Sequence, residues 1–243
     1  MTRSKFLVAA LIAAVVGTAA GAVTAAGAQT APVKKTLWDG LYTDDQASRA
    51  NEVFSTTCAR CHTLDSQGNR PLSGKKFWDS YTQKTVGDLF TFMQKNMPNG
   101  NGGSLSEKTY ADLVALVLKS NGIPAGTTEL VPSSVADIPI LPKDGPAELP
   151  AGALVRVVGC LAKSGPDFVL TSATSPQRTD KTGIAPDDAT RPLGEKSIAL
   201  KFLLTKLDAD IGKRVLATGL LIGVGGIDGL NVSTVAKVAD SCP

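Results

Sequence analysis

Six prolines crowd into residues 123–150 and divide the chain into two halves of different character. They stand at no regular period: Pro124, Pro132, Pro139, Pro142, Pro146 and Pro150. Proline fixes φ and has no backbone N–H, so a segment this rich in proline cannot continue as a long helix or a central strand. We therefore expect an extended, fairly stiff linker over 123–150 and a two-domain α+β protein.

The half before this segment, residues 29–122, has the pattern of helices. Thr43 or Asp44 can cap a first helix, and Thr85 with Asp88 has the spacing of a capping box that begins a second. A third helix is expected after Ser106. Its apolar residues recur at helical spacing, which favours an all-α domain: Tyr110, Leu113, Val114, Val117 and Leu118.

The half after it, residues 151–243, has the pattern of strands. Five segments rich in Val, Ile and Leu lie between Gly, Pro, Asp and Ser residues, at 154–161, 168–172, 198–204, 214–222 and 230–238. The polar stretch 173–196 is expected to form a protruding loop, and 207–211 one helical turn. Five strands with such a turn favour a small β-barrel, and 157–161 and 212–219 resemble segments of small exported OB-fold domains.

The first 28 residues have the pattern of a secretory signal peptide. Arg3 and Lys5 precede an apolar run at 6–16, and Ala26-Gly27-Ala28 supplies small residues for cleavage after Ala28. The alternative is a retained membrane anchor, because the Ala-rich stretch continues to Ala28. We expect cleavage and export, and no membrane span in the mature chain.

Charge argues against nucleic acid as a partner. Without Arg3 and Lys5 the chain has 23 basic and 22 acidic residues, whereas binding to a phosphate backbone requires a concentrated basic face. The strand-rich half is also close to neutral and poor in the aromatic residues on which bases stack. Its expected role is docking or scaffolding.

Cys58-Ala59-Arg60-Cys61-His62 is a C-x-x-C-H pentapeptide, the attachment motif of c-type haem. Two thiols three positions apart can reach the two vinyl groups on one edge of a porphyrin, and the adjacent imidazole can bind the iron. Two alternatives remain, a dithiol redox motif and half of a zinc site completed by Cys160 and Cys242. We favour one covalently attached haem.

The sixth iron ligand cannot be a second histidine, because His62 is the only one in the chain. The candidates are Met97, Met93, a lysine or water. Met97 precedes Pro98 and a Gly/Asn-rich loop, so it lies where a helix ends and a thioether can turn towards the iron. Met93 is better explained as a core residue or part of the wall of the haem site. We favour Met97, and His/Met ligation suits electron transfer.

Residues 38–129 resemble class I mono-haem c-type cytochromes, most closely the bacterial periplasmic ones that serve dehydrogenases or oxidases. The matching stretches are the pentapeptide, Trp38 to Thr43, Pro71 to Gly74, Asn96 to Pro98, and the last helix through Asn121 to Gly126.

This resemblance implies a periplasmic electron carrier with His62 proximal and Met97 distal. It also implies that the Pro71 carbonyl accepts a hydrogen bond from His62. Trp78 would pack near a haem propionate, or serve as a plain core aromatic. The expected partner is a dehydrogenase, an oxidase or another respiratory-chain component. The alternative function is a haem enzyme or sensor with a labile sixth ligand, of peroxidase-like or gas-binding type.

Cys160 and Cys242 remain as a pair in the strand-rich half. Export to an oxidising compartment and an even cysteine count favour a disulfide between them. A β-domain of roughly 90 residues has a small core and gains from such a cross-link.

Overall fold

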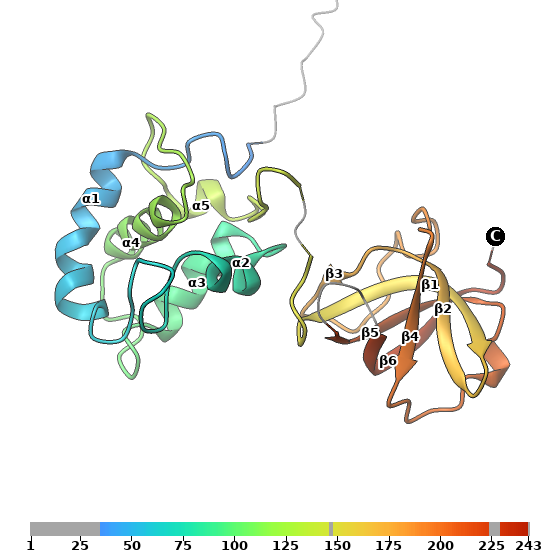
Figure 1. The fold of residues 1–243 in the computed structure, drawn as a ribbon. Coiled ribbons are helices and arrows are strands. Elements are labelled where there is room, and N and C mark those ends of the chain that lie inside the picture. Colours follow the sequence, from blue (N-terminus) through green and yellow to red (C-terminus); the bar gives the residue numbers. More distant parts are fainter. Residues whose placement is uncertain (1–34, 146–147, 224–228, 243) are drawn as a thin grey trace, which may run out of the picture. The chain divides into compact units, whose positions relative to one another are not determined.

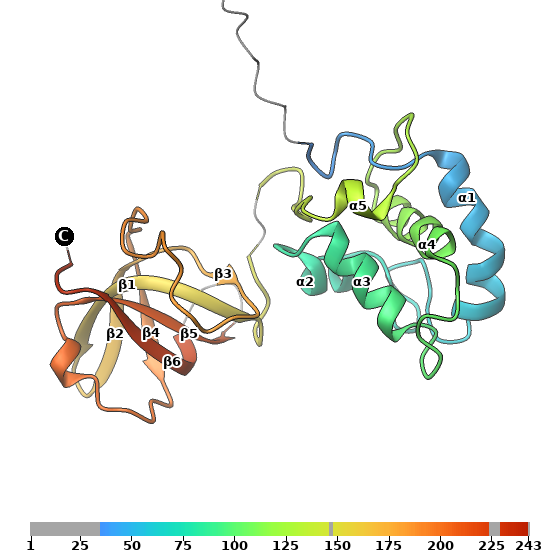
Figure 2. The same ribbon diagram turned by 180° about the vertical axis from the view of Figure 1, so that it is seen from behind.

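The computed structural model describes residues 35–145, 148–223 and 229–242 (Figures 1 and 2). The expected signal peptide over 1–28 lies outside these residues. None of the helices within them is long and apolar enough to cross a membrane.

The first half of the described chain is helical. It contains α1 (Asp44–Val53), the π-turn η1 (Phe54–Cys58), α2 (Lys75–Tyr81), α3 (Val86–Asn96), α4 (Glu107–Ser120) and the short α5 (Pro132–Val135). The three expected helix starts are confirmed, because the side chains of Thr43, Thr85 and Ser106 each accept a backbone hydrogen bond as N-caps. Thr85 and Asp88 also form the expected capping box. The sequence pattern did not predict α2 and α5, which are too short to show a period.

Helix α4 is the centre of this half, and α1 and α3 pack against it (Figure 1). Its residues from Tyr110 to Leu118 are all buried. A helix that is buried on every side needs partners all round. The one carboxylate in this run, Asp112, meets Arg49 of α1 at 3.0 Å, so its charge is paired.

The expected linker over 123–150 is too long. Residues up to 140 belong to the helical core, because the apolar side chains between the prolines are buried there: Ile123, Leu130, Val135, Ile138 and Ile140. The side chain of Gln46 holds this segment, donating to the Leu130 carbonyl at 2.9 Å and accepting from its N–H at 2.6 Å. The prolines exclude a long helix or a central strand, but they do not prevent this segment from burying the residues between them, and Pro132 begins the short helix α5.

The second half is a sheet of six strands: β1 (Leu154–Ser164), β2 (Asp167–Ala173), β3 (Gln177–Arg178), β4 (Lys196–Lys201), β5 (Arg214–Ile222) and β6 (Gly229–Ala239). The order is β2-β4-β6-β5-β1-β3, and β2 also pairs with β1. Among the described residues, β4 and β6 form the single parallel pair. The five expected strands and the turn at Asp208–Asp210 (η2) are confirmed. The strand expected at 198–204 corresponds to β4, which ends at Lys201 because Phe202 takes a left-handed φ of 57°.

The expected loop over 173–196 contains only the short strand β3. A fully buried carboxylate, Asp188, anchors it to the sheet. That carboxylate pairs with Arg156 of β1 and accepts from the Ala185 N–H at 2.6 Å, while the Asp188 carbonyl accepts from Arg214 of β5 at 3.0 Å. Two arginines of the sheet thus hold the loop through one residue.

The expected disulfide is confirmed. Cys160 of β1 and Cys242, which follows β6, are bonded, with their Cα atoms 5.6 Å apart. The bond joins positions 82 residues apart and ties the end of the chain to the first strand of the sheet.

Candidate functional site

The pentapeptide lies where α1 gives way to a wider turn. In η1 the Ala59 N–H donates to the Phe54 carbonyl at 2.8 Å, five residues back. The Cys58 carbonyl then accepts from the N–H groups of both Cys61 and His62, each at 3.0 Å. Such π-turns are rare and often occur at functional sites. The result is a single tight turn that carries two thiols and an imidazole.

The structure argues against both alternative readings of the two cysteines. Cys160 and Cys242 are bonded to each other, so they are not free to complete a zinc site with Cys58 and Cys61. A dithiol redox motif opens a helix after a strand and lowers a thiol pKa. Here the motif follows a helix, and burial raises the pKa of the Cys58 thiol.

The imidazole of His62 is oriented by a backbone carbonyl. Its Nδ1 lies 2.9 Å from the carbonyl oxygen of Arg70. Since a carbonyl only accepts, Nδ1 carries the proton, and in a neutral imidazole Nε2 is then unprotonated and able to bind a metal. The resemblance assigned this contact to Pro71, and the residue is wrong by one position. Arg70 adopts a left-handed φ of 41°, which turns its carbonyl, rather than that of Pro71, towards the ring.

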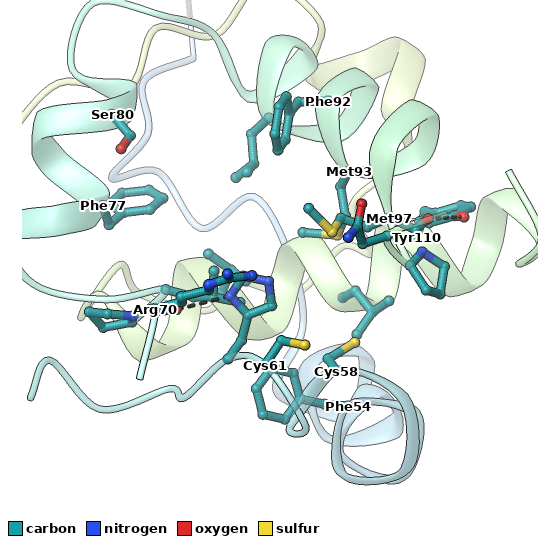
Figure 3. Close-up of a pocket in the computed structure, with 18 of the residues that line it drawn as sticks. Phe54, Cys58, Cys61, Arg70, Phe77, Ser80, Phe92, Met93, Met97 and Tyr110 are labelled. Carbon is teal, nitrogen blue, oxygen red and sulfur yellow. Dashed lines mark hydrogen bonds between the residues drawn. The ribbon is translucent and has the colours of Figure 1, made fainter. Parts of the chain in front are cut away.

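A cavity of about 1020 Å³ adjoins this turn (Figure 3). Cys58, Cys61, His62 and Pro71 line it, and Figure 3 shows the two cysteines on one side with Met93 and Met97 on the other. Eight further lining residues have large apolar side chains: Phe54, Leu72, Phe77, Leu89, Phe92, Leu105, Leu113 and Val117. The volume is at the upper end of the range for small-molecule and cofactor sites. The cavity therefore suits a large, flat apolar group that is held from one edge.

Met97 is fixed by hydrogen bonds of its backbone. It ends α3, and its N–H donates to the Met93 carbonyl at 2.9 Å. Its own carbonyl accepts from the hydroxyl of Tyr110 at 2.6 Å, and that hydroxyl accepts from the Gly103 N–H at 3.1 Å. Tyr110 is completely buried in α4. The sequence pattern identified Tyr110 only as a core residue and did not reveal that its hydroxyl anchors both ends of the loop 97–103.

Trp78 does not line the cavity. Its ring stacks on Trp38 at 6.4 Å between centroids, with 14° between the planes, and Phe77 meets its edge. Trp38 in turn donates through Nε1 to the Leu141 carbonyl at 3.0 Å. Trp78 thus packs as an aromatic residue against the helical core, and its expected contact with a haem propionate stays a prediction.

Two polar residues of the cavity wall were not expected from the sequence. Tyr81, at the end of α2, lies largely buried, and burial raises its pKa to about 12. Lys84 lies between α2 and α3 with its ammonium 5.3 Å from the centre of the Tyr81 ring, and burial lowers the pKa of this lysine. Neither belongs to a motif, so only the folded chain reveals that they share the wall.

Comparison with known proteins gives one family. Residues 45–117 match the family model described as cytochrome c oxidase, cbb3-type, subunit III. The matched stretch is less than a third of the chain, but it includes the pentapeptide and Met97. No curated protein and no solved structure matches the chain. The match supports a c-type cytochrome domain in the helical half, and such a domain implies haem c and electron transfer to redox partners. The sheet half lies outside it.

Proposed function

We propose that this chain is an exported mono-haem c-type cytochrome that transfers electrons between redox partner proteins. One observation carries the proposal. A single turn presents Cys58, Cys61 and His62 to an apolar cavity whose opposite side contains Met97.

The residues of the cavity fit haem c. The thiols of Cys58 and Cys61 would form the two thioethers, and the Nε2 of His62 would be one axial ligand, oriented by the Arg70 carbonyl. The thioether of Met97 would be the other. Haem, when bound, supplies a one-electron couple between ferric and ferrous iron. The apolar wall limits access of water, and the Tyr110 hydroxyl fixes the backbone of Met97.

This arrangement suits an electron carrier rather than an enzyme. With His62 and Met97 both bound, the iron would have no open position for a substrate, and the sequence contains no second histidine to act as an acid or base there. We place the protein in the periplasm because its first 28 residues have the pattern of a secretory signal peptide. A dehydrogenase, an oxidase or another respiratory-chain component would be the partner.

For the sheet half we propose an OB-like barrel with a docking or scaffolding role. The strand pairings support this: β1 pairs with β2, β2 with β4, β4 with β6, β6 with β5 and β5 again with β1. The role of this half rests on fold-level analogy.

The test is the optical spectrum of the full chain, produced in a host that attaches c-type haem. We expect a low-spin reduced spectrum, and an oxidised spectrum with the long-wavelength Met–iron band. Met97→Ala should abolish that band, whereas the matched variant Met93→Ala should keep it. A high-spin spectrum that ignores Met97→Ala, with ready binding of carbon monoxide, would instead indicate the enzyme or sensor with a labile sixth ligand.

We expect Tyr110→Phe to loosen the methionine ligand. The variant leaves the Met97 carbonyl and the Gly103 N–H without the hydroxyl they share, which should cost about 1 to 3 kcal/mol. In a urea titration the Met–iron band should therefore disappear at a lower concentration than in the wild type.

Tyr42→Phe is the matched control, since the Tyr42 hydroxyl donates to the Ile123 carbonyl at 2.6 Å, away from the cavity. It should lower global stability, with the band lost only as the domain unfolds. If the Met–iron band disappeared only with global unfolding in both variants, the Tyr110 hydroxyl would have no specific role in holding Met97.

A further inference from the structure

Three Asn-Gly pairs occur in the chain, at 99–100, 101–102 and 121–122. In such a pair the backbone nitrogen of the glycine can attack the side-chain amide of the asparagine, because glycine has no side chain to obstruct the approach. The attack requires both groups to be free of other partners and the backbone between them to rotate. The folded chain holds the three pairs differently, so we expect them to react at different rates.

Asn121-Gly122 is held at both reacting groups, at the end of α4. The Asn121 side chain accepts from the Gly74 N–H at 3.0 Å and donates to two backbone carbonyls at 2.9 Å each. The Gly122 N–H donates to the Lys119 carbonyl at 3.0 Å. Attack within this pair therefore requires these hydrogen bonds to open first.

Asn99-Gly100 is exposed, in the loop 97–103. Among the residues that the structure describes, neither the Asn99 side chain nor the Gly100 N–H forms a hydrogen bond. A hydrogen bond across the pair, from the Asn101 N–H to the Pro98 carbonyl at 2.8 Å, involves neither reacting group. The space at Gly100 is open, since no atom lies within 4 Å of the position that a Cβ would take. The two reacting groups can thus meet without breaking hydrogen bonds of their own.

Asn101-Gly102 lies in the same loop but is packed more closely. A Cβ on Gly102 would lie 2.1 Å from the Lys95 carbonyl oxygen, so the backbone of this glycine lies against the end of α3. The next residue, Gly103, donates to the Gln94 carbonyl at 2.7 Å. The backbone rotation that the attack requires is therefore more restricted here than in the pair before it.

We infer that Asn99 is a site of spontaneous deamidation at the wall of the cavity. The Gly100 nitrogen bonds to the side-chain carbonyl carbon of Asn99, and the amide nitrogen leaves as ammonia with the proton from the Gly100 N–H. Water, the other reactant, opens the resulting cyclic imide at either carbonyl and gives aspartate or isoaspartate. Nothing is oxidised or reduced, and the loop gains one negative charge.

The modification would alter the surroundings of Met97, two positions away. Asn99 lines the cavity, and the Tyr110 hydroxyl holds both ends of the loop 97–103. Isoaspartate adds a carbon atom to the backbone of this loop, whose present length fits those two hydrogen bonds. We therefore expect deamidation to loosen the Met97 ligand. This consequence rests on the proposed function, whereas the modification itself does not.

The test follows the haem-loaded full chain during incubation in warm, mildly alkaline buffer. Peptide mass spectrometry measures each pair separately, because exchange of the amide nitrogen for oxygen raises the mass of a peptide by about 1 Da. We expect Asn99 to be modified at least about tenfold faster than Asn121 in the folded protein. In concentrated urea, where the hydrogen bonds at Asn121 are broken, the two rates should become similar.

Three results would overturn the site: equal rates at Asn99 and Asn121 in the folded protein, a faster reaction at Asn101 than at Asn99, or no reaction at Asn99. Ammonia released into the buffer should match the extent of modification.

Asn99→Ser and the matched control Asn101→Ser test the consequence for the methionine ligand. After incubation, the Met–iron band of the wild type and of Asn101→Ser should disappear at a lower urea concentration than in fresh protein. Asn99→Ser should keep its initial midpoint. A modified Asn99 with an unchanged midpoint would contradict the loosening of Met97. Modification of Asn99 in a chain that never shows the band would support the site and contradict the proposed function.

Discussion

Cys58→Ala/Cys61→Ala is expected to yield a chain without covalent haem, and a helical half that no longer folds stably. The two thiols come from one turn and are the only described free cysteines. Without them nothing tethers the group that would fill a cavity of about 1020 Å³ lined by core residues. A domain core with an unfilled apolar cavity of that size is strongly destabilised, because the wall loses its packing contacts.

Intact mass and circular dichroism of the purified variant measure both effects. The mass should equal that of the polypeptide alone, and much of the helical signal should be lost. Ala59→Ser is the matched control, since it changes a residue between the same two cysteines and keeps both thiols. A double variant that retains covalently bound haem would refute attachment at these positions.

The helix starts were predictable because each depends on residues only a few positions apart. The disulfide was predictable because one pair of cysteines was left once the haem motif had been assigned. The side chains of Thr43, Thr85 and Ser106 satisfy N–H groups only a few residues away, so the spacing alone identifies them. Cys160 and Cys242 were the pair left after the haem motif was assigned. The strands were predictable because segments rich in Val, Ile and Leu lie between residues typical of turns.

What the sequence did not reveal depends on contacts between distant segments. Burial of the proline-rich stretch depends on Gln46, 84 positions away from Leu130. The carbonyl that orients His62 belongs to Arg70, which has a left-handed φ. The sequence does not show whether the carbonyl of residue 70 or that of residue 71 faces the ring. The role of Tyr110 depends on a hydrogen bond from its hydroxyl to Met97, 13 positions away. A pattern of apolar residues does not predict such a bond.

Cys160→Ala/Cys242→Ala is expected to destabilise the sheet half selectively. The disulfide joins residues 82 positions apart, and a loop of that length contributes about 4.5 kcal/mol in the chain-entropy model. That is a large fraction of the stability of a small domain. The helical half should be little affected, because it has a hydrophobic core of its own, separate from the core of the sheet.

Urea titration with two probes separates the halves in one experiment. The haem absorbance reports the helical half, and far-ultraviolet circular dichroism reports both. The variant should add an early transition that leaves the absorbance unchanged. Wild-type protein treated with dithiothreitol is the control, because reduction breaks the disulfide but leaves thioethers intact, so it should reproduce the variant. If the haem absorbance shifted together with the early transition, the two halves would unfold as one unit, and the sheet would then support the haem domain as well as a partner.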